Sequence, residues 1–362
     1  MNRRLGRFLR SSVGRMRALS CGGILALSLG AVALLQAACT KEEPYTKETF
    51  VMGTKAWVTI AGAKSEDAER AALAVFREMY RIESVMSNWK SSSEVSRLNA
   101  QSQGKPFAVS RELFSLIDSS FYYSERTFGA FDVTVRPLVT LWGFEGGSAA
   151  RLPTDAEIGG AMALIGYGKA TLDPSAPAIT LPPGMEIDLA GVAKGYAVDR
   201  CVAVLRERGI ANAFVNLGGN IFAMGSAPGG RGWPIGIRDP RGGANAVGTI
   251  ILKNEAVATS GNYENFVDID GKRYGHIIDP RTGRPIDAVL SVTVVAPTGL
   301  ESDALSTGLF VLGPERSKDA VASLKRVKAL FAVEEGGEVA YIQVGDFGGT
   351  LRLSDATVLR VQ

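Results

Sequence analysis

His276 is the single histidine of the 362-residue chain, and it lies in the segment "YGHIIDPRTGRP". The unperturbed pKa of an imidazole lies near neutral pH, so histidine is well suited to accept a proton there. The Asp-Pro and Thr-Gly pairs after it are typical of turns, which often carry functional side chains. His276 is therefore a candidate general base, and the alternative is a histidine that only packs.

A second pattern is "IDLAGVAKGYAVD", from Ile187 to Asp199. Gly191 and Gly195 allow a ligand to approach the backbone closely, and a helix is expected from about Gly191. Lys194 then lies in its first turn, where N–H groups and the helix dipole favour an anion. The segment indicates a pyrophosphate site, although alone it favours an ordinary helix start with a solvated lysine.

A third pattern, "ESDALSTGLF", places Asp303 and Thr307 on one face of a helix. Carboxylate and hydroxyl oxygens suit Mg²⁺, which takes few protein ligands beside substrate phosphates. The alternative is a helix start with Asp303 near the cap. The chain has no G-x-x-x-x-G-K-[ST] loop, and "GYGKAT" lacks the third glycine of a dinucleotide fingerprint. Any phosphate must be bound in another way.

Two aromatic stretches complete the candidate site. "GAFDVTVRPLVTLWGF" holds Phe131 and a single acid, Asp132, which could hydrogen-bond a heteroaromatic ring. Trp89 in "VMSNWKSSSEVSRLN" could stack on a flat ligand. The alternative for both stretches is ordinary packing.

Hydrophobic spacing predicts the elements that position these residues. We expect helices over 65–86 with Ser65 as N-cap, around 110–127, from about 191 to 209, and over 301–313 with a glycine stop. We expect strands near 50–62, within 212–225, over 288–297 and 340–347, and a hairpin turning at Asp270-Gly271. Because strands and helices mix without regular βαβ alternation, the sequence predicts an α+β fold with largely antiparallel sheets and packed helices in two intimate subdomains.

The N-terminus is typical of a targeting segment. Residues 1–20 hold six arginines and no acid, and an apolar run from Gly22 ends in small residues at Cys39. This pattern predicts a secretory signal over 1–38, with a tether over 39–47 and the folded domain over 48–362. "LQAAC" resembles a lipobox, with Gln36 where leucine is usual, and predicts a lipoprotein anchored to the periplasmic side of the inner membrane. The alternative is an uncleaved anchor, for which the run is short.

Charge and cysteine content narrow the function classes. Without residues 1–38, Lys+Arg fall from 40 to 34 while Asp+Glu stay at 37, so the formal net charge changes from +3 to −3. The basic balance belongs to the signal and gives no support for nucleic-acid binding. The chain has three cysteines: Cys21 lies in the predicted signal, Cys39 is the candidate for lipidation, and Cys201 alone lies in the folded domain. A single cysteine in that domain excludes both a disulfide framework and Cys/His zinc spacing.

Taken in order, eight segments are similar to the ApbE family of FAD:protein FMN transferases. They are "MGT", "MSNWKSSSEVSRLN", "GAFDVTVRPLVTLWGF", "IDLAGVAKGYAVD", "VNLGGNI", "VATSGNYENF", "HIIDPRTGRP" and "SDALSTGLFVLG". The resemblance implies an ApbE-like fold and Mg²⁺-dependent transfer of FMN from FAD to a threonine of a target protein, with release of AMP. It also implies targets that are flavoprotein subunits of membrane redox complexes, Nqr/Rnf-like, with a D-x-x-[ST]-[GS]-A-T acceptor motif.

The resemblance also assigns roles by position. The residues matching the family's FAD contacts are Met52, Trp89, Ala130, Phe131, Asp132, Asp188, Lys194 and Ile277. The Gly191 carbonyl, Asp303 and Thr307 match its Mg²⁺ ligands, and His276 matches its proposed base. Two alternatives stay open: an FAD pyrophosphatase that uses water as acceptor, and a non-catalytic periplasmic flavin-binding lipoprotein.

Overall fold

The computed structural model describes residues 43–144, 151–242, 246–263, 265–354 and 358–360. The predicted signal and Cys39 lie outside these residues. Residues 43–362 form one compact unit, so the two predicted subdomains do not appear as separate units. Within the described part of the chain, no helix is long and apolar enough to span a bilayer.

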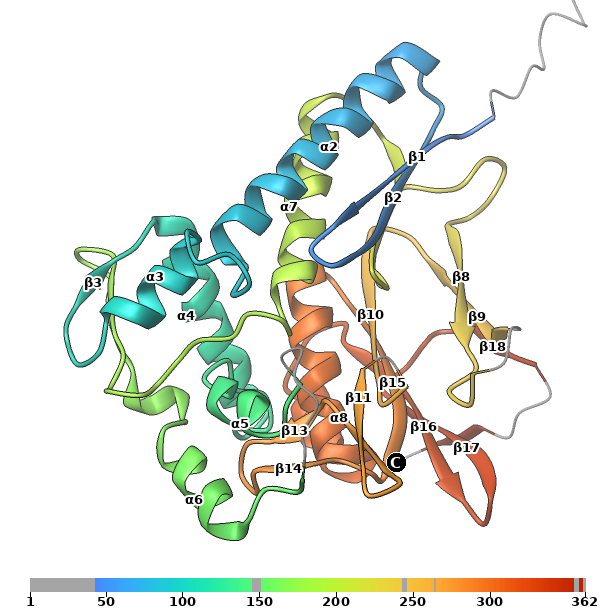
Figure 1. Cartoon of the computed structure of the whole chain (residues 1–362). Coiled ribbons are helices and arrows are strands. Elements are labelled where there is room, and N and C mark those ends of the chain that lie inside the picture. The colour runs from blue at the N-terminus through green and yellow to red at the C-terminus, as the bar shows by residue number, and fades with distance from the viewer. Residues whose placement is uncertain (1–42, 145–150, 243–245, 264, 355–357, 361–362) are drawn as a thin grey trace, which may run out of the picture. The chain divides into compact units, whose positions relative to one another are not determined.

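A nine-stranded sheet forms the centre of this unit (Figure 1). Its strands, in spatial order, are β1 Tyr45–Val51, β2 Thr54–Ala61, β6 Asn212–Leu217, β7 Asn220–Met224, β10 Glu255–Gly261, β15 Val289–Ala296, β16 Lys328–Glu335, β17 Glu338–Val344 and β19 Val358–Arg360. Neighbouring strands are antiparallel except β17 and β19. The antiparallel α+β prediction is confirmed, although β1 already begins inside the segment expected as a tether.

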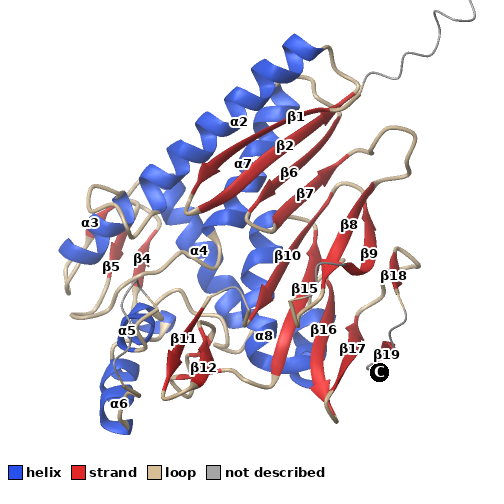
Figure 2. Cartoon of the chain, turned by 45° about the vertical axis from the view of Figure 1, so that its right-hand side comes forward, coloured by secondary structure: helices blue, strands red, loops and turns tan. Residues whose placement is uncertain are grey.

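Helices cover one face of the sheet and a small second sheet covers the other (Figure 2). The covering helices are α2 Ser65–Met86, α7 Ala193–Glu207 and α8 Gly299–Ala322, and the second sheet comprises β8 Trp233–Arg238, β9 Ala246–Leu252 and β18 Leu351–Leu353. In β15, Val292 and Val294 pack with α8 while Val295 packs with Trp233. Burial on both faces explains why apolar residues occupy most positions of this strand on both sides of the sheet.

The remaining elements surround the helical face. They are α3 Glu94–Gln101, α4 Arg111–Arg126, α5 Arg136–Leu141, α6 Asp155–Ala163, the 3₁₀ turn η1 Tyr167–Lys169, the three-stranded sheet of β3 Phe107–Ala108, β5 Ala178–Thr180 and β4 Thr171–Asp173, and the hairpins β11 Phe266–Ile269 with β12 Lys272–Gly275 and β13 Ile278–Asp279 with β14 Arg284–Pro285. The β11–β12 turn is the predicted one, since Asp270 and Gly271 both have positive φ.

Three helix ends differ from the sequence predictions. In α2 the N-cap is Lys64 rather than Ser65, without a side-chain cap, because the backbone is already helical at Ser65. The α7 helix begins at Ala193, so Gly191 lies just before it. The predicted glycine stop in α8 is a kink at Gly313, where φ is 73°, and helix resumes at once.

A close crossing of α7 and α8 joins two of the predicted motifs. A Cβ added to Gly195 would lie 2.1 Å from the carbonyl oxygen of Gly299. The two glycines thus let the helix backbones touch, and the Gly195 N–H donates to Oδ2 of Asp303 at 2.8 Å. This crossing places the lysine segment of α7 beside the acidic turn of α8.

Candidate active site

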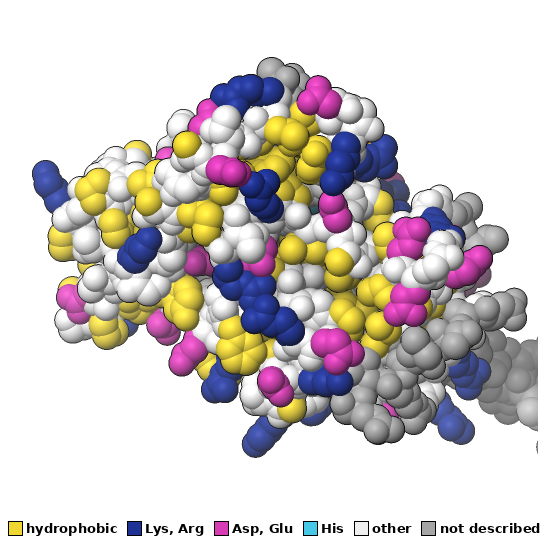
Figure 3. Space-filling view, turned by 90° about the horizontal axis from the view of Figure 1, so that it is seen from below, with side chains coloured by type: hydrophobic (Ala, Val, Ile, Leu, Met, Phe, Trp, Pro, Cys, Tyr) yellow, Lys and Arg dark blue, Asp and Glu magenta, His cyan; other side chains and the backbone are white. Residues whose placement is uncertain are grey.

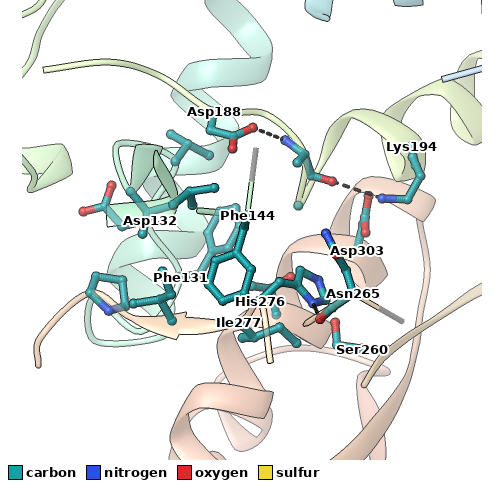
Figure 4. Close-up of a pocket in the computed structure, with 18 of the residues that line it drawn as sticks. Phe131, Asp132, Phe144, Asp188, Lys194, Ser260, Asn265, His276, Ile277 and Asp303 are labelled. Carbon is teal, nitrogen blue, oxygen red and sulfur yellow. Dashed lines mark hydrogen bonds between the residues drawn. The ribbon is translucent and has the colours of Figure 1, made fainter. Parts of the chain in front are cut away.

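A cleft of about 360 Å³ opens beside this crossing (Figure 4). Its volume lies in the range of small-molecule sites. All the predicted site residues except Met52 line it. Met52 lies in the β1–β2 turn with φ 51°, and its N–H donates to Oε1 of Glu83 at 2.8 Å. The structure thus brings together residues that are more than 200 positions apart in the sequence.

One wall is a chain of hydrogen bonds that runs into α7. Oδ1 of Asp188 accepts the N–H of Ala190 at 2.9 Å, and the Ala190 carbonyl accepts Nζ of Lys194 at 3.1 Å (Figure 4). Lys194 is half-buried in the first turn of α7. Its ammonium group and the helix N-terminus together favour an anion in the cleft.

Beside this wall, Asp303 is buried at 4% exposure and lies one helical turn before Thr307. Burial raises the pKa of its carboxyl, and Lys194, the Gly195 N–H and Asn220 oppose that shift. A Cβ on Gly191 would lie 3.3 Å from Oγ1 of Thr307. Gly191, Asp303 and Thr307 therefore meet at one end of the cleft.

These three residues fit a hard divalent cation. A backbone carbonyl, a carboxylate and a hydroxyl are oxygen ligands of the kind Mg²⁺ accepts. A cation would favour the ionised form of Asp303, which burial disfavours. The described residues contain no group of three or more His, Cys, Asp or Glu that could hold a metal ion. Few protein ligands beside phosphate oxygens are the usual arrangement for Mg²⁺.

The hydrogen bonding of His276 defines its tautomer. Its Nδ1 lies 3.0 Å from the carbonyl oxygen of Asn265, which can only accept, so Nδ1 carries the hydrogen. Nε2 is then the ring atom that can take up a proton. Burial, with a smaller effect of Lys194, lowers the pKa of His276 below 6.5, so the imidazole is neutral at pH 7. This is the form that a general base requires.

The remaining predicted residues form an apolar floor and a rim. Ala130, Phe131 and Ile277 are buried beneath the cleft. Trp89 is 75% exposed at its edge, where an indole can stack on a planar ring. Asp132 also lines the cleft, but its oxygens accept from Thr134 and Tyr167 and its carboxylate is turned away from His276 (Figure 4).

Sequence reasoning missed several polar residues that line the cleft. These are Asn88, Asn220, Thr259, Ser260 and Asn265. The side-chain oxygens of Asn88 and Asn220 are buried and have no hydrogen-bond donor among the described residues. An unpaired buried acceptor costs about 1–3 kcal/mol, so each is suited to a ligand. Asn220 follows the "LGG" of a segment used for the resemblance, but its residue type alone indicates no particular chemistry.

The outer face below the molecule carries charges of both signs. On the face seen from below, basic and acidic side chains lie interspersed with apolar ones (Figure 3). Such a mixed face creates little net field, so binding of an anionic ligand depends on local groups such as Lys194.

Known proteins match this chain over most of its length. The ApbE family matches residues 52–331. An FAD:protein FMN transferase of Klebsiella pneumoniae is 33% identical over 312 residues, which cover 83% of this chain and 89% of the relative. One of Vibrio cholerae is 38% identical over 273 residues, covering 74% and 80%.

Solved structures agree with these relatives. The ApbE protein of Thermotoga maritima superposes with a TM-score of 0.76 at 35% identity, covering 82% of this chain and 96% of that one. The flavin transferase ApbE of Vibrio cholerae gives 0.76 at 32% identity, covering 84% and 98%. In sequence and in fold, the chain belongs to the ApbE family.

Proposed function

We propose that this protein is an FAD:protein FMN transferase that moves FMN from FAD to a threonine of a target protein and releases AMP. The observation that carries the proposal is the meeting of Lys194, Asp303 and His276 in one cleft. These residues supply an anion-binding group, a carboxylate for a cation and a neutral imidazole. The names of the relatives, FAD:protein FMN transferase, support the same reaction.

The cleft has separate regions for the parts of FAD. The isoalloxazine ring fits between Trp89 and the apolar floor, and the pyrophosphate fits near Lys194 and the start of α7. Mg²⁺ held by Gly191, Asp303 and Thr307 would neutralise charge on the phosphates. Phosphoryl transfer depends mainly on such positioning and charge stabilisation.

In the proposed reaction, Nε2 of His276 accepts the proton of the threonine hydroxyl. The threonine oxygen forms a bond to the FMN phosphorus, and the bond from this phosphorus to the bridging oxygen breaks. The electron pair of that bond leaves with AMP. Lys194 stabilises the negative charge that develops on the phosphate oxygens. The Nδ1–H bond to Asn265 holds the ring in the base tautomer.

The proposal extends to a location and a class of target. A signal over 1–38 with lipidation at Cys39 would place the domain in the periplasm, tethered to the inner membrane. Its partners would be membrane redox subunits, Nqr/Rnf-like, with a threonine acceptor motif.

Product analysis tests this function. Residues 40–362 are incubated with FAD and a protein that carries the acceptor motif, either with Mg²⁺ or with EDTA. We expect the acceptor mass to rise by one FMN only with Mg²⁺, together with an equal amount of AMP. Free FMN and AMP with an unmodified acceptor would indicate a pyrophosphatase, and intact FAD that stays bound would indicate a flavin-binding protein.

A further inference from the structure

Asn220 occupies a special place at the cation end of the cleft. It is the first residue of β7 and follows Gly218 and Gly219, whose φ values are 58° and 90°. This turn brings its side chain from the central sheet to α8, where the amide lies beside Asp303 and lowers the pKa of that carboxyl. Asn220 is 5% exposed and lines the cleft. It is therefore a buried polar residue beside the carboxylate that we assign to a cation.

The effect on Asp303 indicates how the amide is turned. An amide lowers the pKa of a carboxyl when it presents its Nδ2 donor to the carboxylate, so Oδ1 points elsewhere. Oδ1 is buried and has no hydrogen-bond donor among the described residues. The nearby ammonium group of Lys194 donates to the Ala190 carbonyl. The acceptor of Asn220 is thus available to a ligand.

The chemistry of the site limits what this ligand is. Phosphate oxygens are acceptors and cannot satisfy another acceptor. A divalent cation or one of its bound waters can, because amide oxygens are good ligands of hard cations and Mg²⁺ usually keeps several waters. We propose that Asn220 belongs to the cation site, with Nδ2 orienting Asp303 and Oδ1 facing the coordination sphere of the cation. This inference rests on the cation requirement in the proposed function.

Cation binding to the mature protein without FAD tests this role. Mn²⁺ replaces Mg²⁺ as the probe, and free Mn²⁺ is measured by electron paramagnetic resonance during a titration. We expect Asn220→Ala to weaken Mn²⁺ binding by about tenfold or more, the usual effect of removing a supporting group at a metal. Asn220→Asp lacks the donor to Asp303 but keeps an acceptor oxygen, and should bind within about threefold of wild type.

The control is Asn262→Ala, which removes a half-buried asparagine whose Oδ1 is likewise buried and unpaired but which does not line the cleft. It should leave Mn²⁺ affinity unchanged even if the melting temperature falls. FAD affinity without metal, measured by flavin fluorescence, should change less than about twofold in Asn220→Ala, because its oxygen serves the cation.

Three results would overturn the inference in different ways. If Asn220→Ala binds Mn²⁺ as tightly as wild type, Asn220 does not belong to the cation site, and the proposed function is unaffected. If Asn220→Asp and Asn220→Ala lose Mn²⁺ affinity equally, Asn220 acts only through its Nδ2 contact with Asp303, and Oδ1 does not face the cation. A wild-type protein that binds no Mn²⁺, with or without FAD, would remove the cation requirement itself.

Discussion

The tautomer of His276 is determined by a backbone group rather than by another side chain. The carbonyl of Asn265 fixes the proton on Nδ1, and burial keeps the ring neutral. The sequence identifies His276 as the candidate base, because it is the single histidine of the chain and imidazole titrates near neutral pH. It cannot predict the role of Asn265, since every residue type supplies the same backbone carbonyl. It also cannot predict that the oxygens of Asp132 are engaged by Thr134 and Tyr167, because that depends on folded contacts.

The lowered pKa of His276 gives a pH prediction. Because the folded protein disfavours the imidazolium, the base form persists below pH 6.5 and is lost only on further acidification. The rate of a single transfer at saturating FAD should therefore fall on acidification from pH 7.5 to 5 with an apparent pKa below 6.5. Rapid-quench measurements across this range check it, and an acid limb with an apparent pKa above 6.5 contradicts the assignment.

At the scale of elements, the site depends on the crossing of α7 and α8. Periodicity predicts both helices, and the β11–β12 turn follows from Asp270-Gly271. The contact between Gly195 and Gly299 was not predictable, because nothing local in either helix indicates its partner. The order of the strands in the sheet could not be predicted from the sequence either, because β10 pairs with β7 and β15, which are separated from it by long stretches of chain.

Gly195→Ala tests this crossing. The added Cβ would lie 2.1 Å from the Gly299 carbonyl oxygen, so the helices must separate and Asp303 must move. Overpacking of this kind costs about 1–3 kcal/mol, and we expect a lower melting temperature together with weaker Mn²⁺ binding. Gly160→Ala in α6, where a Cβ meets nothing within 4 Å, should be neutral or slightly stabilising. Equal behaviour of the two variants would contradict this account.

Asp199 of α7, one turn after Gly195, links the same two helices. Its carboxylate accepts the N–H groups of Gly299 at 2.6 Å and Leu300 at 2.8 Å, at the start of α8. Burial raises its pKa to about 6, so the folded state holds this proton more tightly than the unfolded state. The resulting stability is complete below about pH 4, the range of a free aspartate, and is lost as pH rises through about 6.

Asp199→Asn removes this titration. Between pH 4 and 7 the unfolding free energy of the variant should gain about 3 kcal/mol relative to wild type, because each pKa unit corresponds to ~1.4 kcal/mol. Urea unfolding at several pH values measures the difference. A gap between the two proteins that does not change with pH would show that Asp199 has the same pKa in both states.

At the scale of the whole molecule, the predicted anchor can be tested in cells. If Cys39 is lipidated, Cys39→Ser should move the protein from the membrane fraction to the soluble periplasm or leave the signal uncleaved. The matched control is Cys21→Ser, which changes a cysteine inside the signal and should leave attachment intact. Normal cleavage with unchanged membrane attachment of Cys39→Ser would contradict lipidation.

The most direct test of the proposed mechanism compares wild type with His276→Asn in a single turnover at saturating FAD and Mg²⁺, with FMN transfer followed by the mass of the acceptor. We expect transfer to be slowed by about a hundredfold or more, with FAD affinity and melting temperature close to wild type, because only the proton acceptor is lost. A near-normal transfer rate per FAD-loaded molecule would contradict it, and would mean that the single histidine serves packing rather than proton transfer.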